Sequence, residues 1–365
     1  MKSLGKVLFI LLFAVVGAGF GYSIGGGLKR SPLGQEMSQL GAWDIALMLG
    51  SVIPVLAFHE FGHVVGAKLK GMRFLLFIAG PFQITRTPSG LRFNLVWNLG
   101  TFGGLAAALP DPKKPIRPQL LSLIVGGPAA SLLLTLIGLA VFQLSTGPVR
   151  FHGAFIGGFS ALIFLVTAIP SRAGGFMSDG MQFIEVLKGG QAVMQRQKIL
   201  ALSSQSLAGI RPRDWDQQLR EDLMQSVDSM QPLYQAAAHF LALLAAIDRQ
   251  DAAAADQHTQ WLSKNFEAYP VGLRQSLTLE LCLQSLRKGD LEAARKWHGE
   301  SKGGLVDQAR RCFVDAELAL AEGRHADARQ AIDHGLGKLN RTMDPGVAVM
   351  TRDELEHLKR GIPVP

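Results

Sequence analysis

Four long apolar runs constrain the fold of this chain more strongly than any other feature. They are Val7–Gly27, Ile45–Val65, Leu120–Leu144 and Gly153–Pro170. Each is as long, or nearly as long, as the roughly 20 helical residues that cross a bilayer core of about 30 Å. We therefore expect an integral membrane protein that crosses the bilayer several times.

Charge divides the chain after Gly189. Residues 1–189 hold 15 Lys or Arg and 6 Asp or Glu, whereas residues 190–365 hold 22 and 23. The first part is poor in charge for a soluble domain, and the second has an ordinary soluble composition. We predict a transmembrane domain in 1–189 and a soluble helical domain in 190–365. This division excludes a single globular enzyme, a disordered chain and a fibrous repeat.

Basic residues among the apolar runs indicate cytoplasmic loops, so we expect no nucleic-acid partner. Lys68, Lys70 and Arg73 follow the second run, and Lys113, Lys114 and Arg117 precede the third. They place both ends of the loop between these runs in the cytoplasm, although Lys29 and Arg30 favour the reverse. The first run, which we expect to be a retained anchor rather than a cleaved signal peptide, leaves this topology unchanged.

The loop between the second and third runs has a β-like pattern. Two strand-forming runs, Phe74–Thr85 and Leu91–Trp97, flank a turn at residues 87–90. Backbone of this kind lies at membrane depth only where protein or water covers it. We predict a β-hairpin with an exposed edge beside the end of the second run. An ordinary cytoplasmic loop is the alternative.

The second apolar run contains His59, Glu60 and His63 within about one helical turn. Ionisable side chains inside a membrane helix are costly and indicate function. Two histidines four residues apart lie about 40° apart around a helix, so both imidazoles can reach one Zn²⁺. Glu60 would stand beside that ion and could take a proton from the attacking water. Histidines that only pack between helices are the alternative.

A catalytic zinc site also needs a third protein ligand and an open position for water. Leu69 stands where the metzincin motif has a histidine, and Glu185 is the first glutamate after Glu60. Four candidate third ligands remain: Asp111, His152, Asp179 and Glu185.

Asp179 fits the role of third ligand best. It follows the fourth apolar run on the cytoplasmic side, where the second run ends after His63. Gly180 directly follows it and permits a tight chain reversal near a metal. A carboxylate that caps a helix over Met181–Leu187 is the alternative.

These residues resemble the site-2 proteases, a family of intramembrane zinc metalloproteases. The resemblance covers roughly Ile45–Leu187 and rests on His59–His63, Gly127–Ser131 and Ser178–Gly180, in that order. It implies a multi-pass protein of the bacterial inner membrane with a membrane-dipping sheet, a membrane-protein substrate and a cytoplasmic soluble domain. It also implies one Zn²⁺ held by His59, His63 and Asp179, with Glu60 as the catalytic base.

Two residues depart from the family's pattern. The family usually has asparagine where Ser131 stands, and often a second one in the span where Thr167 stands. Serine and threonine still donate hydrogen bonds, so the departure bears on oxyanion support and peptide positioning more than on the metal.

Three segments of the soluble half echo one another: Gln250–Ala255, Gly289–Ala294 and Gly323–Ala328. Their spacing is close to the 34-residue period of tetratricopeptide repeats, whose concave face binds protein partners. An irregular helical bundle is the alternative. Cys282 and Cys312 do not have the spacing of metal ligands, so we expect both to be free thiols that serve only in packing.

The sequence thus predicts an all-α fold, in which a membrane helix bundle with a β-hairpin precedes a soluble helical repeat. We expect a zinc metalloendopeptidase that hydrolyses a peptide bond in or near a transmembrane segment of a partner protein. A non-catalytic membrane scaffold that uses the helical repeats as an adaptor is the main alternative. A metal transporter is a further one, although it would need more polar residues in the other runs.

Overall fold

The structure is a computed structural model that describes residues 32–87, 89–95, 104–111, 113–173, 176–269, 274–302 and 306–362. The first apolar run, Val7–Gly27, lies outside these residues. The described chain forms two compact units, residues 32–55 with 131–162 and residues 56–130 with 163–362. Both units contain parts of the membrane helices, so this division does not test the domain boundary predicted after Gly189.

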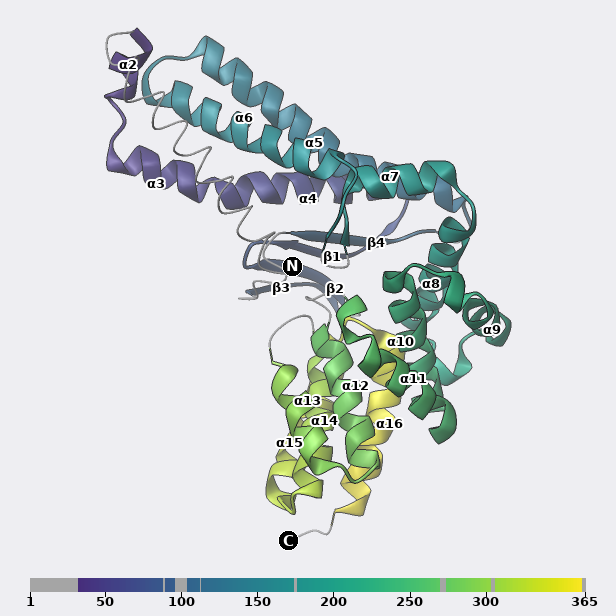
Figure 1. The fold of residues 1–365 in the computed structure, drawn as a ribbon. Helices are drawn as coiled ribbons and strands as arrows, with labels where there is room; N and C mark the ends of the chain where they lie inside the picture. The colour runs from purple at the N-terminus through teal and green to yellow at the C-terminus, as the bar shows by residue number, and fades with distance from the viewer. Residues whose placement is uncertain are drawn as a thin grey trace. The chain divides into compact units, whose positions relative to one another are not determined.

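Three helical segments of the described chain are long and apolar enough to cross a membrane (Figure 1). One consists of α3 (Ala42–Gly50) and α4 (Val52–Leu69), and the others are α5 (Ile116–Leu144) and α6 (Gly147–Ala168). They match the last three apolar runs, which confirms three of the predicted spans as helices of membrane-crossing length and composition.

Polar contacts hold the first unit together. In it, α2 (Pro32–Met37) is tied to α6 by an ion pair between Glu36 and Arg150 with an N–O distance of 3.2 Å. A second pair joins Asp44 of α3 to His152 of α6 at 3.1 Å. His152, one of the candidate third ligands, therefore has a carboxylate partner within its own unit.

In the second unit, α4 and α5 approach each other at two glycines of α4. A Cβ atom built on Gly62 would lie 2.2 Å from the carbonyl oxygen of Gly126, and one on Gly66 would lie 2.1 Å from that of Ser122. The Ser122 hydroxyl donates to the Gly66 carbonyl at 2.7 Å. Small residues permit this backbone approach, which lets membrane helices pack closely. The contact fixes the rotation of α4 against α5.

A four-stranded antiparallel sheet lies between α4 and α5 in the chain. Its strands are β1 (Arg73–Ala79), β2 (Phe82–Thr87), β3 (Gly90–Leu95) and β4 (Leu105–Leu109). The strand order is β3-β2-β1-β4, so β3 and β4 form the two edges.

The predicted hairpin is wrong in its number of strands. The run Phe74–Thr85 contains two strands, because the chain reverses at Gly80, whose φ of 56° favours glycine. The strand β4 was not predicted, because its sequence Leu-Ala-Ala-Ala-Leu lacks the β-branched and aromatic residues that mark strands. Trp97 lies outside the described residues.

The described chain beyond residue 178 is helical. A two-stranded ribbon of β5 (Arg172–Ala173) and β6 (Phe176–Met177) precedes it. The helices are α7 (Asp179–Lys188), α8 (Gln191–Leu207), α9 (Gln217–Gln225), α10 (Pro232–Asp248), α11 (Ala252–Lys264), α12 (Arg274–Arg287), α13 (Leu291–Glu300), α14 (Gln308–Ala321), α15 (His325–Lys338) and α16 (Pro345–Gly361).

The three echoing segments form turns between paired helices: α10 with α11, α12 with α13, and α14 with α15. At each turn one residue has a positive φ: 60° at Gln250, 74° at Gly289 and 74° at Gly323. Asp251 and Asp290 cap the helices that follow the first two turns. The helical character of this part is confirmed, and its relation to tetratricopeptide repeats stays a prediction.

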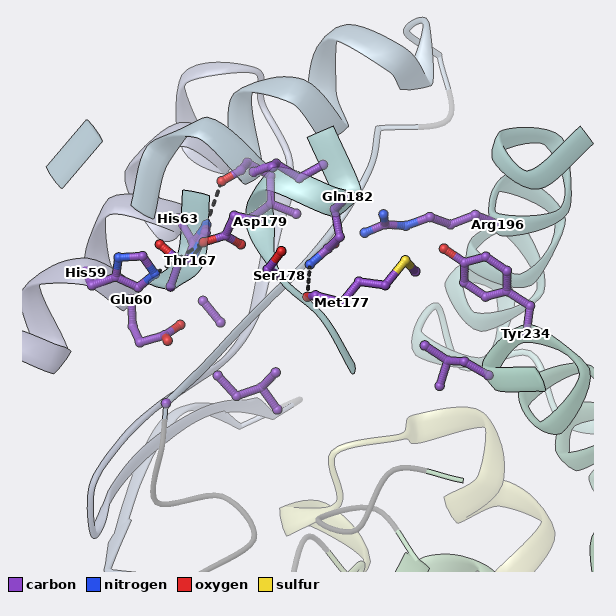
Figure 2. A pocket seen from close by; sticks show the side chains of 16 residues that line it. His59, Glu60, His63, Thr167, Met177, Ser178, Asp179, Gln182, Arg196 and Tyr234 are labelled. Carbon is purple, nitrogen blue, oxygen red and sulfur yellow. Dashed lines mark hydrogen bonds and ion pairs between the residues drawn. The ribbon is translucent and has the colours of Figure 1, made fainter. Parts of the chain in front are cut away.

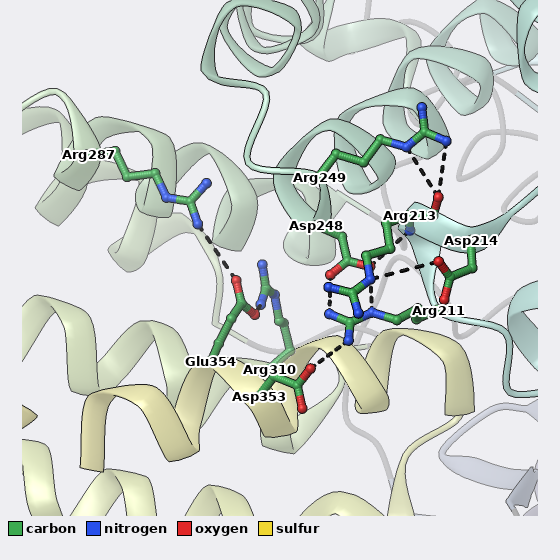
Figure 3. A network of polar contacts seen from close by, with 9 residues as sticks. All are labelled: Arg211, Arg213, Asp214, Asp248, Arg249, Arg287, Arg310, Asp353 and Glu354. Atoms are coloured by element: carbon green, nitrogen blue, oxygen red, sulfur yellow. Dashed lines mark hydrogen bonds and ion pairs between the residues drawn. The ribbon is translucent and has the colours of Figure 1, made fainter. Parts of the chain in front are cut away.

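Two largely buried arginines in the helical part, Arg310 and Arg211, have carboxylate partners (Figure 3). Arg310 donates to Glu280 at 2.7 and 2.8 Å and also to Glu354. Arg211 donates to Asp248 at 3.0 Å. Such pairing is expected, because a buried charge without a partner is strongly destabilising.

Gly62→Leu should destabilise the protein by about 3 kcal/mol, because its side chain would collide with the α5 backbone. Gly158→Leu is the matched control, since a Cβ there meets nothing within 4 Å. Thermal unfolding of both variants in detergent micelles measures the difference. Equal melting temperatures would show that the helix crossing is not as tight as described.

Candidate metal centre

The structure brings together three of the residues singled out in the sequence. His59 and His63 lie one turn apart on α4, and Asp179 is the first residue of α7. The carboxylate oxygen Oδ2 of Asp179 lies 3.4 Å from Nε2 of His59 and 3.5 Å from Nε2 of His63. Figure 2 shows the three side chains converging at one end of a pocket.

This cluster has the donor set and the spacing of a metal site. One ligand atom from each residue can be chosen so that all three lie within 4.8 Å of one another. Ligand atoms at 2.0–2.1 Å from a tetrahedral Zn²⁺ are about 3.4 Å apart, which is close to the two observed distances from Asp179. Two imidazoles and a carboxylate leave a fourth position open, as in catalytic zinc sites. The residues present therefore fit zinc.

Helix α5 orients His63. Its Nδ1 atom lies 2.8 Å from the carbonyl oxygen of Leu123, which can only accept, so Nδ1 carries a proton and Nε2 is the nitrogen that would bind a metal ion. Gly127 leaves space for the ring, because a Cβ built there would lie 2.3 Å from Nε2 of His63. The Gly127–Ser131 motif, a weak signal in the sequence, thus has a steric function at this site.

Asp179 is free to face the histidines because Ser178 caps the helix instead. The Ser178 hydroxyl oxygen accepts from the Met181 amide at 3.3 Å, so the alternative in which Asp179 caps this helix does not hold. The chain reversal expected at Gly180 is also wrong, since this residue is helical. Its lack of a side chain is needed because a Cβ would lie 1.8 Å from the carbonyl oxygen of Ala168.

The charge state of Asp179 suits a metal ligand. Burial alone would raise the pKa of this carboxyl, but its hydrogen bonds with His59 and His63 outweigh burial and hold the pKa below its usual value. The side chain is therefore an anion at neutral pH.

Glu60 lies beside the cluster and beneath β4. It is 7% exposed, and the residue that precedes β4, Gly104, leaves room for its carboxylate. A Cβ built on Gly104 would lie 2.4 Å from Oε1 of Glu60. The Glu60 carboxylate, an acid–base group, therefore lies next to the candidate metal position.

The cluster lines a pocket of about 440 Å³. Its walls include Leu105 and Ala106 of β4, Thr167 of α6 and, from the helical half, Arg196 of α8 and Tyr234 of α10. The last two were missed in the sequence, because no local spacing links them to His59 and His63, which lie more than 100 residues earlier. Only their tertiary contacts identify them.

The other candidate third ligands have different partners. The Asp111 carboxylate pairs with Lys114 at 3.3 Å. Glu185 is buried on α7, where it accepts from the Tyr234 hydroxyl at 3.1 Å and from Gln231. Burial raises the pKa of Tyr234 to about 12, so this hydroxyl keeps its proton and donates. Among the four candidates within the described chain, Asp179 alone joins the two histidines.

Comparison with known proteins identifies the family. The family model named Peptidase family M50 matches residues 46–298, which is more than half of the chain. The chain belongs to peptidase family M50. This is the site-2 protease family, so the resemblance stated from the sequence is confirmed. No curated protein and no solved structure matches the chain significantly.

Membership in family M50 implies that the chain is a membrane metallopeptidase. The match begins in α3 and ends in α13, so it includes the histidine pair, the sheet and Asp179 as well as part of the helical half. The M50 family is zinc-dependent in general, in agreement with the donor set of the cluster.

Replacing His59, His63 or Asp179 by alanine should each lower the zinc content of the purified protein substantially, because three protein ligands are the usual catalytic set. Glu185→Gln is the matched control, a buried carboxylate on the same helix with other partners. Metal analysis after dialysis measures the occupancy. Full zinc in Asp179→Ala together with loss in Glu185→Gln would identify Glu185 as the ligand instead.

Proposed function

We propose that this M50 member is a zinc endopeptidase that cleaves a partner protein in or near a transmembrane segment. The observation that carries the proposal is the approach of Asp179 to both histidines at ligand-to-ligand distances, with Glu60 alongside. Both histidines of the cluster belong to a helical segment of membrane-crossing length, so the substrate would be a membrane protein. The enzyme would work in a lipid environment.

In this proposal His59, His63 and Asp179 hold one Zn²⁺. The ion, when bound, supplies a Lewis acid that polarises the peptide carbonyl and makes water a better nucleophile. Glu60 accepts the proton of the attacking water and then passes it to the leaving amine. The walls formed by β4 and α5 bury Glu60 and His63, so both act with little competition from bulk water.

Glu60→Gln should abolish cleavage while zinc stays bound, because the carboxylate is proposed as a base and not as a ligand. We expect a loss of at least about 10³-fold in rate, or several kcal/mol in the barrier. Cleavage of a co-expressed membrane protein and metal content are measured on the same preparation. Undiminished cleavage would contradict the catalytic assignment and favour the scaffold alternative.

A membrane protease must also hold its substrate in an unwound form. A transmembrane helix hides its carbonyl groups in its own hydrogen bonds. The exposed edge of a sheet can hold an unwound segment through main-chain pairing. We propose β4 as that edge, because Leu105 and Ala106 line the pocket and β4 pairs only with β1 among the described strands.

This assignment corrects the edge expected from the sequence. The strand β2, which contains Ile84, is paired on both sides, and β3, which contains Phe93, forms the opposite edge of the sheet. Neither Ile84 nor Phe93 lines the metal pocket, whereas two residues of β4 do.

A proline scan across Leu105–Leu109 tests this docking mode. Amide groups of an antiparallel edge strand point alternately toward the neighbouring strand and away from it. Proline where the amide points away should keep fold and zinc but slow cleavage about tenfold, the value of one lost hydrogen bond. Phe93→Pro on the far edge should cleave normally. Normal rates in every folded, zinc-loaded β4 variant would exclude docking at this edge.

The proposal includes a location and a role for the helical half. We propose that residues 190–365 lie in the cytoplasm and that the protein belongs to a bacterial inner membrane; the basic residues around the sheet support this orientation. Paired helices of this kind present surfaces that bind protein partners, so this half could recruit or select substrates.

A further inference from the structure

One cation in the metal pocket, Arg196, interacts with Tyr234 but has a buried donor that no acceptor of the described chain satisfies. Arg196 of α8 lines the pocket, and its NH1 nitrogen is buried without a hydrogen-bond acceptor among the described residues. No ion pair joins Arg196 to a carboxylate within the described chain either. Buried donors are nearly always satisfied, so an unsatisfied one in a pocket indicates a missing acceptor.

Two largely buried arginines of the described chain have carboxylate partners instead. Arg310 binds Glu280 and Glu354, and Arg211 binds Asp248. Each of these guanidinium groups donates its hydrogen bonds to carboxylates of the same chain. Arg196 differs from these two arginines, because no carboxylate of the described chain pairs with it.

The carboxylates nearest to Arg196 along the pocket are already engaged. Asp179 faces His59 and His63. Glu185 accepts from Tyr234 and Gln231. The NH1 nitrogen of Arg196 is therefore available to a carboxylate of a molecule that enters the pocket.

Arg196 lies away from the place where a peptide bond would be cut. Figure 2 shows Gln182 between Asp179 and the guanidinium group, with Arg196 and Tyr234 at the opposite end of the pocket from His59. Arg196 is thus placed to contact a group some distance along the substrate and not the reacting carbonyl.

The distance between Arg196 and the metal cluster is set by helix packing. Val193 of α8 packs with Val186 of α7 and with Leu120 and Ile124 of α5 in one buried cluster. The helix that carries Arg196 is therefore packed directly on the helix that begins with Asp179. A substrate group bound at Arg196 would lie at a fixed distance from the scissile bond.

We propose that Arg196 forms a specificity subsite for a carboxylate of the substrate, on the same chain segment that is cut. This inference rests on the proposed proteolytic function and names the substrate class: apolar segments with an acidic side chain or a free C-terminus near the cleavage point. Arginine suits this task, because its planar guanidinium binds carboxylates through two parallel hydrogen bonds.

The test uses the full-length protein in detergent micelles with Glu60→Gln, so that binding is measured without cleavage. The probes are fluorescein-labelled 12-residue apolar peptides with a central Gly-Pro. One set carries a single Glu or its Gln counterpart at successive positions and ends in a carboxamide. Another peptide has no Glu and ends in a free carboxylate, which separates the two sources of the anion.

At one position of the Glu, or with the free C-terminus, we expect about tenfold tighter binding than for the neutral peptide, as for a charged hydrogen bond. Arg196→Gln should remove this preference, Arg196→Lys should keep part of it, and Arg196→Glu should reverse it, so that the Gln peptide binds more tightly than the Glu peptide. Zinc content should not change. Arg220→Gln is the matched control, because its buried NH2 also lacks an acceptor but lines a different pocket.

Binding that does not distinguish acidic from neutral peptides, or a preference that survives in Arg196→Gln, would overturn the inference. Failure of the proposed function has a different signature. In that case the protein with Glu60 intact would leave bound peptides uncut, although the preference for a carboxylate still depended on Arg196.

Discussion

The structure depends on the contacts that offset the free-energy cost of burying three ionisable side chains in an apolar helix. His59, Glu60 and His63 are each less than 10% exposed, and such groups are costly inside a membrane unless they are paired. Asp179 approaches both histidines, and the Leu123 carbonyl accepts from His63. These contacts come from α7 and α5. The positions of two further helices are therefore coupled to the polar residues of α4.

Glycine makes these approaches possible. Gly62 and Gly66 let the backbone of α4 touch α5, Gly127 leaves space for the His63 ring, and Gly180 lets α7 begin against the end of α6. At each point an added Cβ would lie under 2.5 Å from a backbone oxygen or a ring nitrogen. The site is assembled by contacts in which a methyl group is too large, so its geometry tolerates little variation.

The helical half contributes to the pocket as well as following it in the chain. Met177, just before Asp179, packs against the core that contains Tyr234, and α8 packs on α7. Arg196 and Tyr234 thereby enter the wall of the metal pocket. An attached domain that supplies part of a pocket can influence which substrates bind, in addition to any role as a docking surface for partners. The proposed carboxylate subsite is one such influence.

The sequence determined the features that arise from local patterning. Apolar runs of sufficient length become helices, because their backbone groups must form hydrogen bonds with one another in lipid. The four-residue spacing of His59 and His63 places both on one helix face. Only the tertiary structure decided which carboxylate meets them, that the sheet has four strands, and that β4 is the edge at the pocket. These depend on contacts between residues tens to more than a hundred positions apart. Arg196 is the clearest case, because α8 carries no sequence motif that links its side chain to the pocket.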